Sequence, residues 1–185
     1  MQINHFRWMV CASVVVAGGC HPGARPEWSK NDAFLIKSSA ANWAWGGGSE
    51  YGCCIASDGA VARYRYNLGS RRPVAAPPPA KAAAAADLMA RYCPGAQTVG
   101  HATELAGKGS LLATASTAPI QEQAVAIDAP AHGVDGYFLD SGSRQYREVV
   151  LAAAGDIKRV NPSPAAAELL QWSQSVFVRF GCAMP

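Results

Sequence analysis

The spacing of the cysteines constrains this fold more than any other feature of the sequence. Four of the six cysteines lie beyond residue 50, as Cys53, Cys54, Cys93 and Cys182. An even set of this kind predicts two disulfides, provided that the chain is exported to an oxidising compartment. A bond between the adjacent Cys53 and Cys54 is disfavoured, because neighbouring side chains on a strand point to opposite faces. We therefore expect one of them to join Cys93 and the other to join Cys182, and the sequence does not say which.

The N-terminal segment has the residue order of an export signal. His5 and Arg7 precede an apolar run, residues 8–17, that ends in small residues, as in secretory signals. The run is well short of the ~20 apolar residues that cross a bilayer as a stable helix. We therefore expect residues 1–19 to be a signal peptide, which places the cysteines in an oxidising compartment.

The end of this signal carries a possible lipidation site. Ala17-Gly18-Gly19-Cys20 resembles the lipobox of bacterial lipoproteins, although Ala17 stands where that family usually has Leu, Val or Ile. The resemblance ends at Cys20 and implies that this cysteine is acylated and becomes the mature N-terminus, whereas a plain secretory signal is the alternative. His21, rather than Asp, implies sorting to the outer membrane, with the protein facing the periplasm. Several acyl chains on one residue hold a protein at a membrane, since each buried methylene contributes ~0.8 kcal/mol.

The rest of the chain predicts a tether followed by one domain. Residues 20–32 are polar and contain proline, which is typical of a linker. Residues 33–185 are close to the commonest domain size and are expected to form a single globular domain.

The expected elements of this domain alternate between strands and helices. Asp58-Gly59 is a strong hairpin signal, and Ser163 precedes Pro164 at the start of an expected C-terminal helix. A second helix is expected within residues 80–93. Strands are expected at residues 33–37, 52–56, 60–66, 111–115, 123–127, 137–139, 146–152 and 157–160. We therefore predict an α+β fold, a mostly antiparallel sheet packed with two helices and stabilised by disulfides.

The sequence lacks the motifs of familiar enzyme classes. It contains no Gly-x-Ser-x-Gly elbow and no Ser-x-x-Lys motif, and the loop before Lys108 is too short to wrap a phosphate. His101 and Glu104 have helical spacing but lack a second histidine close in sequence, because His132 is distant. We expect no metal site, no cofactor and no enzymatic activity.

The charge of the chain bears on its partners. The sequence holds 16 basic and 13 acidic residues, for a net charge of +3. Proteins that bind nucleic acid concentrate Lys and Arg on one face. We therefore expect no nucleic-acid partner.

The most unusual part of the expected domain is a loop rich in glycine and aromatic residues. Its members are Trp43, Trp45, Gly46, Gly47, Gly48 and Tyr51. Aromatic side chains on a mobile loop supply a large contact area, as in binding loops; the alternative is that the tryptophans fold back into the core. On the expected strand at residues 60–66, Arg63 and Arg65 share one face, and Tyr64 and Tyr66 share the other. The simple interpretation is tyrosines toward the core and arginines toward water, and the alternative is an arginine pair that docks an acidic partner.

These features together favour a binding protein of the cell envelope. The expected anchor, disulfides and lack of a catalytic motif predict a lipoprotein held to the membrane by its N-terminal lipid, which binds a partner protein. An inhibitor or immunity-type protein is one such function. The alternatives are a structural accessory of an envelope assembly and an enzyme of unfamiliar type.

Overall fold

The computed structural model describes residues 33–42, 48–67, 85–125, 130–140 and 145–182. The expected signal peptide, Cys20 and the tether lie outside these residues, as do Trp43, Trp45, Gly46 and Gly47.

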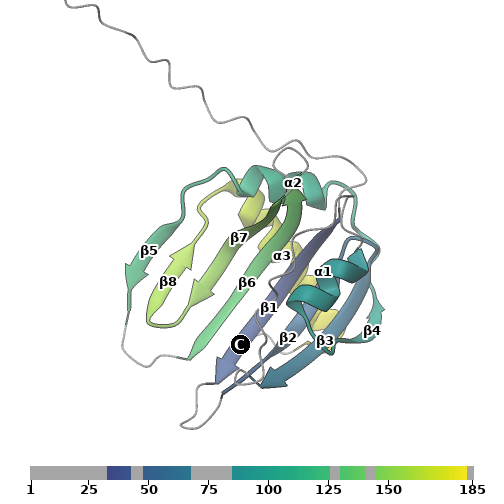
Figure 1. Cartoon of the computed structure of the whole chain (residues 1–185). Helices are drawn as coiled ribbons and strands as arrows, with labels where there is room; N and C mark the ends of the chain where they lie inside the picture. Colours follow the sequence, from purple (N-terminus) through teal and green to yellow (C-terminus); the bar gives the residue numbers. More distant parts are fainter. Residues whose placement is uncertain (1–32, 43–47, 68–84, 126–129, 141–144, 183–185) are drawn as a thin grey trace, which may run out of the picture.

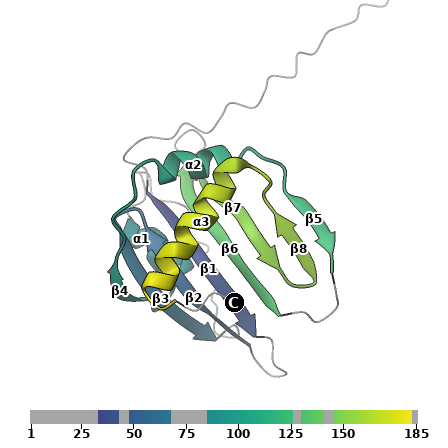
Figure 2. The ribbon, with the colours of Figure 1, turned by 180° about the vertical axis from the view of Figure 1, so that it is seen from behind.

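The described residues form one antiparallel sheet with helices on both faces (Figures 1 and 2). The eight strands follow the order β4-β3-β2-β1-β6-β7-β8-β5. Their bounds are β1 Phe34–Asn42, β2 Ser49–Ala56, β3 Ala60–Asn67, β4 Gln97–His101, β5 Gln121–Ala124, β6 Ala131–Asp140, β7 Gln145–Ala154 and β8 Ile157–Val160. The helices are α1 Ala85–Tyr92, α2 Lys108–Ala115 and α3 Pro164–Arg179. The predicted α+β class with a mostly antiparallel sheet is confirmed.

Side chains that alternate across the strands build two apolar layers, one on each face of the sheet. α2 and α3 cover one face (Figure 2), and α1 covers part of the other (Figure 1). On β1, for example, Ile36 packs toward α3 while Leu35 packs toward α1. The fully buried side chains of the α3 layer include Ile36, Ile55, Leu112, Leu151, Leu169 and Phe177, and those of the α1 layer include Leu35, Cys54 and Leu88.

The start of α3 follows directly from its sequence. Pro164 occupies the first turn, where its missing N–H removes no hydrogen bond. The Ser163 hydroxyl accepts a hydrogen bond from the Ala166 amide at 3.2 Å, as predicted. The side chain of Asn161 donates to the Ala115 carbonyl at 2.9 Å, which ties the start of α3 to the end of α2.

One expected strand is a helix, so the described residues contain three helices instead of the two predicted. Residues 111–115 belong to α2, and Leu112 and Ala115 are fully buried there. Leucine and alanine are good helix formers, and the helix places Leu112 directly above Gly136 of β6. A Cβ atom at Gly136 would lie 2.2 Å from Leu112 Cδ1, so the missing side chain makes room for the helix.

The two disulfides begin at neighbouring residues of β2 and lie on opposite faces of the sheet. Cys53 joins Cys182, just beyond α3, with 6.0 Å between the Cα atoms. Cys54 joins Cys93, just beyond α1, with 6.8 Å between the Cα atoms. The prediction that one cysteine joins Cys93 and the other Cys182 is confirmed, and one strand fastens a helix on each side of the sheet.

Candidate binding cavity beside Arg65

A cavity of about 770 Å³ is lined by residues of β1, β2, β3 and β4 and by the residues just beyond α3. Figure 2 shows that α3 crosses the sheet and ends over these strands. We call this cavity the Arg65 cavity. It is lined by Asn42, Ser49, Tyr51, Gly52, Cys53, Arg63, Tyr64, Arg65, Gly95, Gln97, Gly181 and Cys182.

Strand register explains which side chains meet at this cavity. Tyr51 pairs with Arg65 across β2 and β3, and Cys53 pairs with Arg63. Cys53 reaches Cys182 on the α3 face, and alternation places its neighbours Tyr51, Arg63 and Arg65 on that face as well. The hairpin therefore presents an aromatic ring and two guanidinium groups beside the disulfide.

Arg63 ties the end of α3 to β3. Its Nη2 atom donates hydrogen bonds to the carbonyls of Phe180 at 2.8 Å and Gly181 at 2.9 Å. A cation at these carbonyls also interacts favourably with the negative end of the helix dipole. Arg63 thus has a structural role in addition to lining the cavity.

Arg65 has no such protein partner among the described residues. It is exposed, its guanidinium carbon lies 6.0 Å from the centre of the Tyr51 ring, and that tyrosine is 42 % exposed. No described Asp or Glu forms an ion pair with Arg63 or Arg65. None of the described residues that line the cavity is acidic. An arginine supported by an aromatic ring in this way presents a planar fork of donors to an anion.

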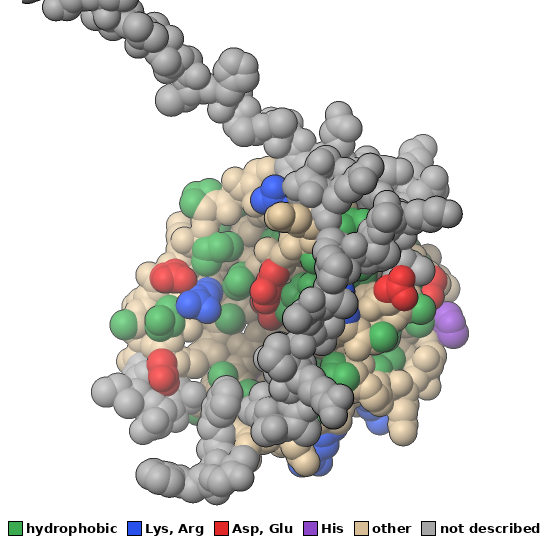
Figure 3. Space-filling model, viewed as in Figure 1, with side chains coloured by type: hydrophobic (Ala, Val, Ile, Leu, Met, Phe, Trp, Pro, Cys, Tyr) green, Lys and Arg blue, Asp and Glu red, His purple; other side chains and the backbone are tan. Residues whose placement is uncertain are grey.

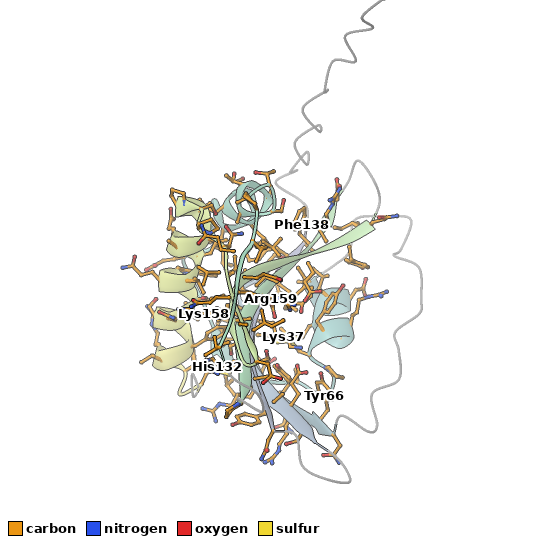
Figure 4. All side chains as sticks on the ribbon, turned by 90° about the vertical axis from the view of Figure 1, so that its left-hand side faces the viewer. Lys37, Tyr66, His132, Phe138, Lys158 and Arg159 are labelled. Atoms are coloured by element: carbon orange, nitrogen blue, oxygen red, sulfur yellow. A yellow bond between two sulfur atoms is a disulfide. The ribbon has the colours of Figure 1, made fainter. Side chains whose placement is uncertain are left out.

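Glu50, which precedes Tyr51 on β2, is an acid buried on the opposite face of the sheet. It forms an ion pair with Lys37 and accepts hydrogen bonds from the hydroxyls of Tyr64 at 3.1 Å and Tyr66 at 2.6 Å. Burial alone raises the pKa of Glu50, but the hydrogen bonds from Lys37 and Tyr66 outweigh it, so the pKa lies below its usual value. Figure 4 shows Lys37 and Tyr66 on the side of the sheet that carries α1. Glu50 therefore stabilises the core and does not neutralise the arginines.

A second group of polar side chains lies on the α1 side, centred on Asp135 of β6. Burial and the negative charge of Glu148 raise the pKa of Asp135 to about 7, although Lys37 acts in the opposite direction. Tyr137 donates a hydrogen bond to Glu148 at 3.1 Å. Figure 3 shows acidic and basic side chains together over the half of the sheet that α1 leaves uncovered, where Arg159 pairs with Glu122 at 2.8 Å. The charges on this face are mixed and largely paired with one another.

The structure brings together some of the residues that the sequence singled out. Tyr51, Arg63 and Arg65 line one cavity, and Gly48 lies half-buried just before β2. The prediction that the tyrosines face the core and the arginines face solvent agrees with their burial, since Tyr64 is buried, Tyr66 is half-buried, and both arginines are exposed.

Other members of the cavity carried little or no signal in the sequence. Asn42 and Ser49 flank the glycine-rich loop in the sequence, so their place beside a binding loop could have been predicted. Gln97 and Gly181 were not, because their positions depend on the pairing of β4 with β3 and on the Cys53–Cys182 disulfide.

The histidines do not meet. His101 ends β4 and His132 lies on β6, and three strands lie between β4 and β6 in the sheet. Within the described ranges, no three His, Cys, Asp or Glu side chains converge as a metal site would require. In the same ranges, no helix has the length and apolar character needed to cross a bilayer.

Comparison of the chain with protein-family models, with curated proteins and with solved structures gives no match.

Proposed function

We propose that this chain is a membrane-anchored lipoprotein of the bacterial envelope, facing the periplasm, that binds a partner protein through loop 43–47 and the adjoining Arg65 cavity. An inhibitor or immunity-type protein is the function that fits this arrangement best. The observation that carries the proposal is the position of the cavity. Asn42 and Ser49, the described residues on either side of the glycine- and tryptophan-rich segment in the sequence, line the same cavity as Arg65.

The scaffold behind this surface supports a binding role. Cys53 of β2 lines the cavity and is bonded to Cys182 beyond α3, while the neighbouring Cys54 holds α1 from the other face. A rigid framework of this kind positions loop residues for recognition at a small entropic cost.

The anchor supports the same proposal from the sequence. Acylation at Cys20 and a polar tether over residues 20–32 would hold the domain close to the membrane while leaving the loop accessible. A structural accessory of an envelope assembly is the competing function. Such a protein would use the broader mixed-charge face over β7, β8 and β5 instead of the loop.

The experiment compares capture of envelope proteins by the full chain and by two variants expressed in its own cells. Replacement of Trp43 and Trp45 by Ala should reduce capture of the partner at least tenfold, because buried aromatic anchors carry most of the energy of an interface. Ile157→Ala is the matched control, since Ile157 is exposed on β8. It should leave capture unchanged.

The captured protein is then purified and titrated against the same three chains, with thermal melts in parallel. Loss of binding by the tryptophan variant at an unchanged melting temperature supports the proposal. A melting temperature lowered by 10 °C or more would instead make the tryptophans core residues. Loss of binding only in Ile157→Ala would favour the structural accessory.

A further inference from the structure

The Arg65 cavity has a one-sided charge. Two arginines line it, and none of its described lining residues is acidic. Elsewhere on the described surface, Lys108, Arg147 and Arg159 each pair with a carboxylate, whereas Lys158 and Arg179 lie singly, each without an ion pair among the described residues. The cavity is thus a place where positive charge is concentrated without an internal counterion among the described residues.

The two arginines have separate roles at this site. Arg63 is held by the Phe180 and Gly181 carbonyls through one nitrogen, so its side chain is fixed and its charge faces the cavity. Within the described residues Arg65 makes no hydrogen bond or ion pair, and its guanidinium group lies over the ring of Tyr51, 6.0 Å from the ring centre. A cation–π contact of this kind leaves the in-plane N–H groups of the guanidinium free to donate.

We propose that the Arg65 cavity binds a carboxylate side chain from an acidic segment of a partner protein, with Arg65 as the bidentate anchor and Arg63 as a second positive charge. This inference rests on the proposed function and narrows it to a chemical class of partner. The neutral polar side chains of Asn42, Ser49 and Gln97 line the same cavity and provide further hydrogen-bonding groups around the acid.

A carboxylate fits this site for geometric and electrostatic reasons. The guanidinium fork matches the two oxygens of a carboxylate, and such pairs are shorter and stronger than neutral hydrogen bonds. A cavity also removes part of the water that weakens exposed ion pairs, which contribute only about 0.2–1 kcal/mol in the open.

The test measures binding of a synthetic peptide of alternating Glu and Ser, carrying an uncharged dye, to the purified full chain at low salt. The same peptide with Gln in place of Glu is the first comparison, and inorganic phosphate is used as a competitor. Arg65→Gln should weaken binding of the Glu peptide at least fivefold. Arg65→Lys keeps the charge but loses the fork, and should fall between Arg65→Gln and the wild type.

Lys158→Gln is the matched control, because it removes one exposed positive charge from β8. β3 and β8 are five strand positions apart in the sheet, or roughly 24 Å at the usual strand spacing. This variant should bind the Glu peptide as the wild type does. Equal weakening by Arg65→Gln and Lys158→Gln would show a general charge effect and overturn the proposal.

Two further outcomes would also overturn it. One is equal binding of the Glu and Gln peptides. The other comes from a competition experiment that includes free glutamate as a second competitor. Displacement of the Glu peptide at a lower concentration of phosphate than of glutamate would assign the cavity to a phosphate group.

The inference and the proposed function fail in different ways. Capture that depends on Trp43 and Trp45 but not on Arg65 would leave the binding function intact and remove the carboxylate site. If binding of the Glu peptide depends on Arg65 but no partner is captured through the tryptophans, the carboxylate site stands and the proposed binding function of the loop fails.

Discussion

We predict that removal of each disulfide lowers the free energy of unfolding and loosens only the helix that the disulfide holds. Cys54–Cys93 closes a sequence separation of 39 residues and Cys53–Cys182 one of 129 residues. The chain-entropy relation gives stabilisations of about 4 kcal/mol for the first and about 5 kcal/mol for the second. Replacement of Cys54 and Cys93 by Ala should therefore lower the free energy of unfolding by up to about 4 kcal/mol, much of the stability of a typical domain.

The effect of this variant should also be local. α1 has eight residues, too few for a helix that is stable by itself. In the variant it would be held mainly by Leu88, which is fully buried against the sheet. Amide hydrogen exchange should show loss of protection in α1, while α3 keeps its protection through Cys53–Cys182.

Urea unfolding followed by fluorescence, together with hydrogen exchange, tests this prediction. The variant that replaces Cys53 and Cys182 is the comparison, and it should lose protection at the C-terminal end of α3 instead. A loss below about 1 kcal/mol, or equal deprotection of α1 and α3 in both variants, would refute the reasoning.

Three further predictions concern charged groups. Glu50→Gln should lower the free energy of unfolding by about 3–5 kcal/mol in urea unfolding, because it leaves Lys37 buried without its counterion; a loss below 1 kcal/mol would contradict this. Asp135→Asn should stabilise the protein by up to about 4 kcal/mol at pH 8 and hardly at all below pH 4, because a folded-state pKa of about 7 against an ordinary 3.8 makes the wild-type stability fall as the pH rises from about 4 to about 7 and level off above it. A variant curve parallel to the wild-type curve across this pH range would show that Asp135 does not titrate there. Arg63→Ala should cost about 1 kcal/mol and increase hydrogen exchange at the end of α3, where two carbonyls lose their donor; unchanged exchange there would rule out the clamp.

Local chemistry explains the parts of the fold that the sequence predicted. Asp58-Gly59 sets the β2–β3 hairpin, and the turn includes a hydrogen bond from the Ala60 amide to the Asp58 carboxylate at 3.0 Å. Ser163 and Pro164 fix the start of α3. The opposite directions of adjacent side chains on a strand were enough to exclude a bond between Cys53 and Cys54.

Tertiary contacts explain what the sequence did not predict. Residues 111–115 read equally well as a short buried strand or a buried helix, because a brief apolar run carries no clear period. The missing side chain at Gly136 leaves room for Leu112, and this space favours the helix. The choice between Cys93 and Cys182 for each cysteine likewise depends on which helix covers which face.

The candidate site was predictable only in part. The aromatic and arginine residues stood out by type, and their pairing follows from the hairpin register that Asp58-Gly59 sets. The separate roles of the two arginines could not be predicted from the sequence. They depend on the end of α3, which lies far along the chain but beside Arg63 in the fold.

The most direct test of the central claim is photo-crosslinking in cells that express the full chain. A photoreactive residue replaces Gln97, which is exposed and lines the Arg65 cavity, or Gln123, which is exposed on the opposite edge strand. The account predicts a specific protein adduct from position 97 and none from position 123. An adduct from position 123 alone, the same adduct from both positions, or no protein adduct from position 97 would contradict it.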